Sequence, residues 1–476
     1  MSELRTRQNI WTLVGEDPAD PWHPVVLAYA RAIGVLQDRS DANADDPTGW
    51  TYQAEIHGMF SDPMDGFRNK CQHFSWFFLP WHRMYLFHFE SIIRSVVEGL
   101  DDVDDDTKAM WALPYWNYLD GQESRRLPVV FRLQTLPDGS PNPLFDPTRL
   151  RVVNNGAPIP DVDADYFAAL QPVLFTGATQ FGGAQTGETH AFEDPNSAAG
   201  PLENSPHGAV HVAVGGNMGG FETAGFDPIF WLHHANVDRI WDVWLGQGGG
   251  RANPTDPAWL SAIEYHFHDE AGVETTMTVD DVLDNENQLN YVYEDTSGPA
   301  GPLGGEEMAP EPDNPPQLVG ATEEPVQLTG ETANVSFPVS EPAGPLEGQA
   351  PSRVYLRLED LTSQVRPGVS YAVYLNVPDG DDETPDDHYV GTASLFGVPQ
   401  AGDVDRDHPG MRLVFDITDL HQRLTDAGLW SDRVSVRFAP VYVAEPAGPQ
   451  EPADQVPGTE QEPGAVNVGQ VSVFYQ

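Results

Sequence analysis

Six histidines, arranged in two groups of three, constrain the fold of this chain more than any other feature. The groups are His57, His73 and His82, and His207, His211 and His234. His207 and His211 are four residues apart, so on a helix they point the same way, one turn apart. Three imidazoles per group, without a cluster of thiolates or carboxylates, favour a borderline metal such as copper, zinc or nickel. The fold must therefore bring these distant segments together.

Prolines mark where four helices are expected to begin, because proline fits the first helical turn. One helix is predicted from Pro24 to about residue 37 and a second from Pro80 to about residue 98, each with apolar residues at helical spacing. Ser205-Pro206 and Asp227-Pro228 each place a capping residue before a proline, so two more helices are expected there. The first part of the chain is therefore predicted to be a helix bundle with long loops.

These predicted helices carry four of the six histidines in the two groups. His82 falls in the first turn of the second helix, and His234 lies about two turns into the fourth. His73 precedes His82 by nine residues. That spacing is about two and a half helical turns, so the two rings could not share one face of a helix. We therefore expect His73 on the loop before that helix.

Composition divides the chain into three parts. Residues 1–295 are rich in Trp, Phe and His, whereas residues 296–325 are dominated by Gly, Pro and Glu, which indicates a linker. Residues 326–476 contain short alternating apolar runs, which favour an antiparallel β-sandwich. The predicted fold class is α+β with several domains: a mainly α-helical domain built round a helix bundle, then a C-terminal β-sandwich. The clearest alternating runs are 354–358, 371–375, 434–438 and 471–475.

The chain is strongly acidic and poor in lysine. Its 476 residues include 73 Asp and Glu against 24 Lys and Arg, a formal net charge of −49, and the only lysines are Lys70 and Lys108. A field of this sign repels nucleic-acid phosphates and anionic lipids, so neither is expected as a partner. Disorder does not follow, because 40% of the residues are hydrophobic. The composition resembles that of proteins from salt-adapted organisms. The alternative is an acidic protein from a mesophilic organism that is not adapted to salt.

Cysteine usage and the N-terminal residues bear on the compartment. Cys71 is the only cysteine, which excludes an intramolecular disulfide and a zinc cluster built on cysteines. The residues MSELRTRQNIWTLVG lack the apolar core of an export signal. No stretch approaches the roughly 18 uninterrupted apolar residues of a membrane span. We therefore expect a cytoplasmic protein without a membrane segment.

The most specific signatures are two histidine-bearing segments, FFLPWHRMYLFHFE (77–90) and DPIFWLHHANVDRIW (227–241). They resemble the copper-binding signatures of the type 3 copper family, which comprises tyrosinases, catechol oxidases (polyphenol oxidases) and molluscan-type hemocyanins. Tyr291-Val292-Tyr293 is similar to the motif that closes the catalytic domain in plant-like members. The resemblance covers residues 1–295 and extends weakly into the β-rich residues 326–476. Three further segments support it: ALPYWNYLDG (112–121), LENSPHGAVH (202–211) and NMGGFETAGFDPIF (217–230).

The resemblance implies two copper ions per chain, each held by one group of histidines. His57, His73 and His82 would hold the first ion, and His207, His211 and His234 the second. In the family's paired-histidine motif the second residue is the ligand, so His234 is chosen and His233 is assigned to packing. Three neutral imidazoles leave an open face on each ion, where dioxygen bridges the pair.

Two neighbours of these ligands have alternative interpretations. Cys71 and His73 match the Cys-x-His spacing that forms a thioether crosslink in fungal and molluscan members; the alternative is an inert, buried cysteine. Asp238 follows His234 by four residues and is expected either to accept the outer N–H of a ligand or to pair with an arginine.

Three more positions match the substrate side of the plant-like site. Glu203 matches an acid that holds a water near the copper pair and can take the phenolic proton; the alternative is a charge at a helix start. Gly208 stands where members active on monophenols often carry Asn, so no side chain orients that water. Phe221 matches a bulky residue that overhangs the first copper; the alternative is core packing.

The resemblance implies oxidation of o-diphenols (catechols) to o-quinones by dioxygen, with at most weak hydroxylation of monophenols because of Gly208. The alternatives are an o-aminophenol oxidase and a reversible dioxygen carrier, since hemocyanins share both copper motifs. The expected partners are small phenolic substrates and dioxygen. The C-terminal domain, residues 326–476, is expected to cover the site and to make the enzyme latent.

Overall fold

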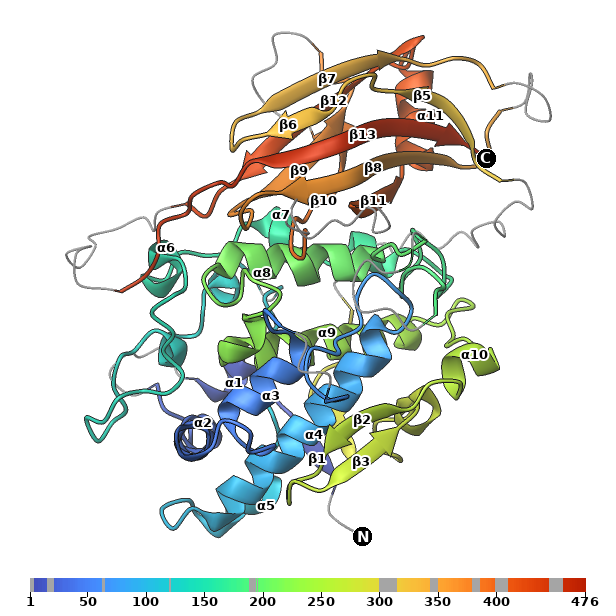
Figure 1. The fold of residues 1–476 in the computed structure, drawn as a ribbon. Helices are drawn as coiled ribbons and strands as arrows, with labels where there is room; N and C mark the ends of the chain where they lie inside the picture. Colours follow the sequence, from blue (N-terminus) through green and yellow to red (C-terminus); the bar gives the residue numbers. More distant parts are fainter. Residues whose placement is uncertain are drawn as a thin grey trace.

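The protein consists of a helical domain with a domain of β-sheets lying against it (Figure 1). The computed structural model describes residues 4–14, 21–61, 65–119, 121–187, 194, 196–298, 315–342, 350–378, 386–398, 410–444 and 457–476. Of the segment predicted to be a linker, residues 299–314 lie outside the described residues, and strand β5 (Gln317–Ala321) occupies part of the rest. Within the described chain, no helix combines the length and hydrophobicity needed to cross a membrane.

Four helices form the centre of the helical domain. They are α2 (Pro24–Ala42), α3 (Trp50–His57), α4 (Phe78–Gly99) and α9 (Ile229–Gly246). Helix α4 packs against both α2 and α9, and the helices at Pro24, Pro80 and Pro228 are confirmed. The apolar face predicted for α2 is fully buried, which follows from its 3.6-residue period. Shorter helices are α1 (Ile10–Leu13), α5 (Asp105–Met110), α6 (Arg151–Asn154), α7 (Asp161–Ala164) and α10 (Pro257–Leu260).

The helix expected to begin at Pro206 starts earlier and contains a break. Helical turn η5 (Glu203–Gly208) runs directly into α8 (Ala209–Val214), and Ser205 inside it has the extended backbone angles φ −145° and ψ 128°. Proline disfavours the helical conformation in the residue before it, which explains the break. Ser205 therefore interrupts a helical segment rather than starting one, and His207 and His211 follow the break.

The C-terminal domain consists of two antiparallel sheets packed round one core, as predicted. One sheet has the order β10-β9-β12-β7, and the other has the order β11-β8-β13-β5, with β6 also paired to β13. The four predicted alternating runs lie in β8, β9, β12 and β13, where Leu356 pairs with Val473. The strands are β6 (Val326–Leu328), β7 (Ala333–Pro338), β8 (Val354–Ser363), β9 (Ser370–Leu375), β10 (Tyr389–Ala393), β11 (Met411–Asp416), β12 (Arg433–Val441) and β13 (Val466–Tyr475).

Two small strand pairs and one further helix lie outside these groups. Strands β2 (Tyr265–His268) and β3 (Glu274–Met277) form an antiparallel pair beside α4. Strand β1 (Arg5–Arg7) pairs in parallel with β4 (Tyr291–Tyr293), so the start of the helical domain is joined to its end. Helix α11 (Thr418–Asp426) belongs to the β domain and contacts β8.

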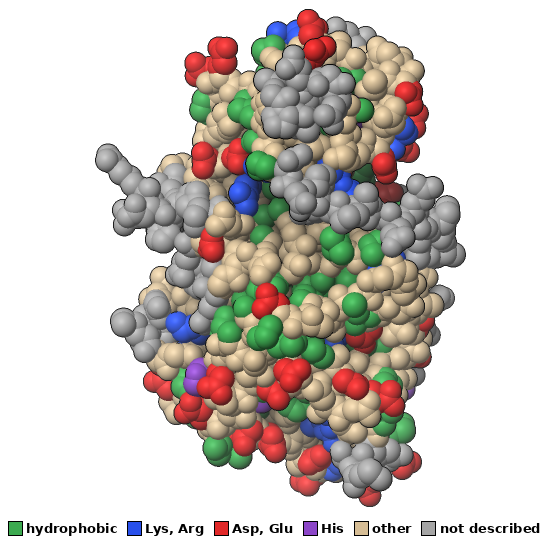
Figure 2. Space-filling model, turned by 90° about the vertical axis from the view of Figure 1, so that its right-hand side faces the viewer, with side chains coloured by type: hydrophobic (Ala, Val, Ile, Leu, Met, Phe, Trp, Pro, Cys, Tyr) green, Lys and Arg blue, Asp and Glu red, His purple; other side chains and the backbone are tan. Residues whose placement is uncertain are grey.

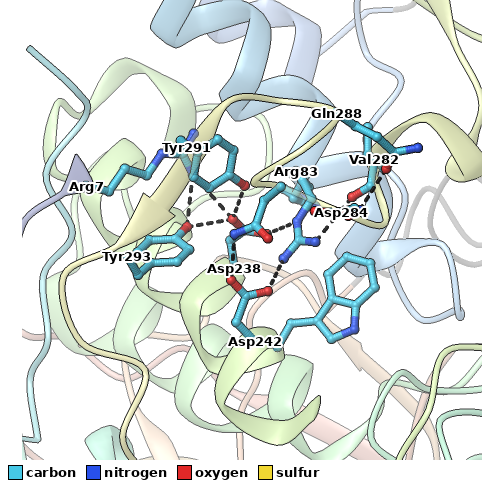
Figure 3. A network of polar contacts seen from close by, with 12 residues as sticks. Arg7, Arg83, Asp238, Asp242, Val282, Asp284, Gln288, Tyr291 and Tyr293 are labelled. Atoms are coloured by element: carbon cyan, nitrogen blue, oxygen red, sulfur yellow. Dashed lines mark hydrogen bonds and ion pairs between the residues drawn. The ribbon is translucent and has the colours of Figure 1, made fainter. Parts of the chain in front are cut away.

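A buried polar network joins these termini to the helices that carry the histidines (Figure 3). Asp238 of α9 lies at its centre: the carboxylate accepts hydrogen bonds from Arg83 (2.5 Å), Arg7 (3.3 Å), Tyr291 (2.7 Å) and Tyr293 (2.5 Å). Burial disfavours the carboxylate, but the two guanidinium groups hold the pKa of Asp238 below its ordinary value. Of the two roles expected for Asp238, the structure shows the pairing with arginine.

Replacing Asp238 with alanine should destabilise the helical domain by about 3–5 kcal/mol. The buried Arg7 and Arg83 would each lose one carboxylate partner, keeping Glu90 and Asp242 respectively, and the hydroxyls of Tyr291 and Tyr293 would lose their acceptor. Urea unfolding of the metal-free protein measures this change. The control is Glu98→Ala. It removes an exposed ion pair between Glu98 and Arg94, both on α4, and should cost less than about 1 kcal/mol. Equal losses in both variants would contradict this role of the network.

Candidate metal centre

The two predicted histidine groups converge in one buried cluster between the helices. His73 lies on the loop before α4, as expected, and its ring centroid is 5.7 Å from that of His207. The rings of His82 and His234 are stacked, with centroids 4.5 Å apart. The remaining members are His57 at the end of α3 and His211 on α8. All six side chains are at most 3% exposed.

Their ligand atoms form three overlapping sets, each with all atoms within 4.8 Å of one another. His57 and His234 therefore connect sets that contain members of both predicted groups. Such close spacing of imidazoles within one buried volume suits two neighbouring metal ions. The sets are His207, His211, His233 and His234; His57, Cys71 and His73; and His57, His82 and His234.

Backbone carbonyls orient four of the rings. In each, Nδ1 lies within hydrogen-bond distance of a backbone oxygen, so a proton on Nδ1 leaves the Nε2 lone pair for a metal. The Nε2 atoms of His82 and His207 are buried and have no hydrogen-bond partner among the described residues. These rings therefore fit a metal better than a packed core. The four contacts are His57 to Phe221 (3.1 Å), His82 to Phe78 (2.8 Å), His207 to Glu203 (2.9 Å) and His211 to Met218 (2.8 Å).

Burial keeps the imidazoles neutral, which is the form that binds metals. Removal from water lowers the pKa of His207 to about 3. Burial also holds the pKa values of His73, His82, His211 and His234 well below the ordinary value, and repulsion between neighbouring rings adds to this effect.

His233, which the sequence interpretation assigned to packing, is also part of the cluster. Its ring is stacked 5.6 Å from that of His207 and lies 4.9 Å from that of His211. The sequence signal that could have placed His233 in the cluster is its position directly before His234 on α9. The choice of His234 over His233 as a ligand stays a prediction from the resemblance.

Cys71 lies beside the first group of histidines. Its side chain is fully buried, and Sγ is within 4.8 Å of ligand atoms of His57 and His73. Burial raises the pKa of the Cys71 thiol well above its ordinary value, so the protonated form is favoured. The crosslink to His73 stays a prediction.

Phe221 and Glu203 lie near the cluster, and the roles that the resemblance implies for them stay predictions. The ring of Phe221 lies 4.7 Å from that of His73 and 5.5 Å from that of His57, over the first group. Glu203 Oε1 accepts a hydrogen bond of 2.6 Å from the amide of Phe74, and Oε2 is buried without a partner in the described chain. Burial raises the pKa of Glu203 well above its ordinary value. The buried Glu203 carboxyl therefore differs from a solvated charge at a helix start.

A loop of the β domain reaches into this site. Phe396 follows strand β10, and its ring is stacked on His211 with a centroid distance of 4.1 Å and an interplanar angle of 11°. The same ring lies 5.7 Å from that of His207 and 5.9 Å from that of Phe221. Phe396 is only 4% exposed, so it fills space directly over the second group of histidines.

The same loop packs against Gly208. A Cβ atom at position 208 would lie 2.5 Å from Oγ and 3.2 Å from Cβ of Ser394. Asn204 fixes the loop there: its side chain donates to the carbonyl of Thr392 (2.6 Å) and accepts from the amide of Ser394 (3.1 Å). The absence of a side chain at Gly208 therefore makes room for the β domain.

Three family models match successive parts of the chain. The common central domain of tyrosinase matches residues 47–165 and 154–247, and the polyphenol oxidase middle domain matches residues 253–300. A domain of unknown function matches residues 315–476. The tyrosinase HcTyr1 of Hahella sp. (strain CCB-MM4) is 32% identical over 493 residues, covering 92% of this chain and 95% of that protein. The chain belongs to the tyrosinase family. It is a type 3 copper oxidoreductase, whose chemistry is the oxidation of phenols.

Plant enzymes of the family match mainly the helical domain. The latent polyphenol oxidase of Prunus armeniaca is 35% identical over 283 residues, covering 54% of this chain and 44% of that protein. Catechol oxidase B of Solanum tuberosum is 33% identical over 294 residues, covering 56% and 46%. The chain therefore aligns with about half the length of these relatives.

The two-domain architecture is shared with solved latent enzymes. Latent apple tyrosinase superposes with a TM-score of 0.64 at 22% identity, over 100% of this chain and 98% of that one. Latent aurone synthase superposes with a TM-score of 0.65 at 25% identity, over 99% and 90%. The fold is thus a helical tyrosinase domain followed by C-terminal β-sheets, as the sequence predicted.

The buried histidines predict that the metal-free protein loses stability in acid. Folding lowers their pKa values, so below the unfolded-state value of about 6.5 the histidines take up protons in the unfolded state but not in the folded one. The free energy of unfolding is therefore largest above pH 6.5 and decreases as the pH falls towards about 3. For His207 alone the loss at pH 5 is about 2 kcal/mol. Urea unfolding at pH 7 and pH 5 measures it. His207→Gln should reduce the difference, whereas His266→Gln, at an exposed site, should not. An undiminished loss in His207→Gln would contradict this account.

Proposed function

We propose that this protein oxidises o-diphenols to o-quinones with dioxygen, using two copper ions per chain. The observation that carries the proposal is the convergence of both histidine groups in one buried cluster beneath Phe221. Six neutral imidazoles in that volume match the ligand set of a coupled copper pair. The relatives named catechol oxidase and polyphenol oxidase support the same chemistry.

Each part of the site has a role in this chemistry. Copper, when bound, supplies the binding of dioxygen and the transfer of electrons. The backbone carbonyls at Phe78 and Glu203 hold His82 and His207 in the orientation that presents Nε2. The ring of Phe221 forms an apolar wall for a phenolic ring and excludes water. The carboxyl of Glu203 is placed to exchange a proton beside the histidines.

Catechols are the proposed substrates rather than monophenols. Hydroxylation of a monophenol requires removal of its proton at the copper pair, and a side chain that orients a water assists this step. Gly208 provides no such side chain. An o-aminophenol presents the same pair of adjacent donor groups as a catechol, so oxidation of o-aminophenols is the second candidate.

Metal analysis and oxygen uptake test this function together. The copper-loaded protein should contain two copper ions per chain and should consume oxygen with catechol at least about tenfold faster than with phenol. His82→Ala should lose copper, because it removes one ligand of the cluster. The control His88→Ala, on the same helix, should retain both ions, since His88 contacts Met277 instead. Two bound ions without oxygen uptake on catechol, phenol or o-aminophenol would contradict the proposal and support a dioxygen carrier.

We also propose that the β domain makes the enzyme latent by placing Phe396 over the site. Phe396→Ala in the full chain, or cleavage within 296–325, should raise catechol oxidation at least about tenfold, because a ring-sized volume over His211 becomes available. Initial rates of oxygen uptake measure the change. The control Tyr442→Ala removes an exposed ring from the same domain and should leave the rate unchanged. Unchanged rates after both treatments would exclude shielding.

Concentrated salt is the proposed working medium. In Figure 2, acidic side chains are spread over the visible face of both domains, with few basic ones among them. At a net charge of −49, self-repulsion destabilises the folded state in dilute buffer, and salt screens it. The oxygen-uptake assays run in molar KCl and in dilute buffer test this, and greater activity in dilute buffer would contradict it.

A further inference from the structure

We propose that Glu222, Thr223 and Phe60 form a subsite for the positively charged group of a phenolic substrate, and that Arg366 of the β domain occupies it in the closed form. This inference rests on the proposed function, because it names the substrate class of the same site. The subsite lies beside the first histidine group, and no other role assigned above uses its three residues.

Backbone packing places Glu222 next to the metal centre. Glu222 directly follows Phe221, whose carbonyl contacts Nδ1 of His57 at 3.1 Å. A Cβ atom on Gly58, the residue after His57, would lie 2.6 Å from that carbonyl oxygen and 3.1 Å from the Cα atom of Glu222. Because position 58 is glycine, the segment that carries Glu222 can lie directly against the end of α3.

The guanidinium of Arg366 already occupies this place. It donates to Oε2 of Glu222 at 3.3 Å and to the hydroxyl of Thr223 at 3.2 Å, and its central carbon lies 5.6 Å from the centre of the Phe60 ring. Phe60 is 76% exposed, which is unusual for a phenylalanine. A carboxylate, a hydroxyl and an aromatic ring together are the groups that bind an organic cation.

Gly220 provides room for the cation. A Cβ atom at position 220 would lie 2.1 Å from the central carbon of the Arg366 guanidinium. Any side chain at this position would therefore displace the group. The missing side chain at Gly220 therefore leaves the space beside Glu222 and Thr223 that the guanidinium fills.

The β domain therefore presents the ring of Phe396 to the histidine cluster and the guanidinium of Arg366 to the proposed subsite. Phe396 is stacked on His211, and the loop continues at Gly397, where an added Cβ atom would lie 3.4 Å from the ring of Phe221. Arg366 contacts the residue after Phe221. A phenol with an amine-bearing side chain has the same two features. A phenol with a carboxylate would instead meet Glu222 with like charge.

A second ion pair between the domains provides a matched comparison. Arg151 of the helical domain pairs with Glu460 at 2.7 Å, beside the bridge between Leu150 and Thr459. Glu460 is 64% exposed. Removing this pair loosens the same interface but leaves Glu222 and Phe60 intact.

Binding of phenethylamine tests the subsite without copper chemistry. In the full-length, metal-free chain carrying Phe396→Ala, adding Arg366→Ala should lower the Kd of phenethylamine about tenfold, because the competing guanidinium is removed. Adding Glu222→Gln should abolish this gain. Glu460→Gln should not affect it, and binding of the neutral 2-phenylethanol should be the same in all variants. Titration calorimetry measures each Kd. A Kd for phenethylamine that Glu222→Gln leaves unchanged would overturn the proposal.

Oxidation of matched catechols gives the second measurement. In the copper-loaded Phe396→Ala, Arg366→Ala protein, Glu222→Gln should lower kcat/KM for dopamine relative to dihydrocaffeate about tenfold, mainly through KM. An unchanged ratio would overturn the subsite. If no catechol is oxidised although phenethylamine binding depends on Glu222, the proposed function fails and the subsite stands.

Discussion

The buried contact between Arg83 and Asp238 determines how the two metal-binding helices face each other. Arg83 follows His82 on α4, and Asp238 follows His234 by one helical turn on α9. Their 2.5 Å contact therefore constrains the distance between His82 and His234. The hydroxyls of Tyr291 and Tyr293 also donate to Asp238, which connects this contact to the end of the helical domain (Figure 3). A buried ion pair contributes little net stability over an apolar pair, but it strongly disfavours any packing that separates its charges. Here that property fixes the register of the two helices.

Local sequence patterns were sufficient for three of the four central helices, the four alternating strands and most of the histidine cluster, but not for α3. Proline and apolar periodicity located α2, α4 and α9, because these signals act within a few residues. The helical turn before Ser205 was not predicted, since no residue pattern marked its start, whereas the extended backbone of Ser205 itself follows from Pro206. His233 was set aside because the second residue of the family's paired-histidine motif is the ligand, yet the His233 ring also lies beside those of His207 and His211.

The contacts between the domains could not be predicted from the sequence, and shielding of the site by residues 326–476 stays a prediction. Phe396 and Arg366 belong to loops with no motif, and their partners are far away in the sequence. In concentrated salt the screening length falls to about 3 Å, so exposed ion pairs between the domains contribute little there. The stacked ring of Phe396 and the hydrogen bonds of Asn204 do not depend on charge, so they can hold the domains together in such a medium.

Gly208 gives the chain an unusual evolutionary constraint. The residue is adjacent to His207, and Ser394 of the β domain packs directly against it. A mutation to Asn would place a side chain beside His207 and push the loop that carries Ser394 outward in the same step. Any side chain acquired at this position would therefore require a compensating change in the loop that carries Ser394.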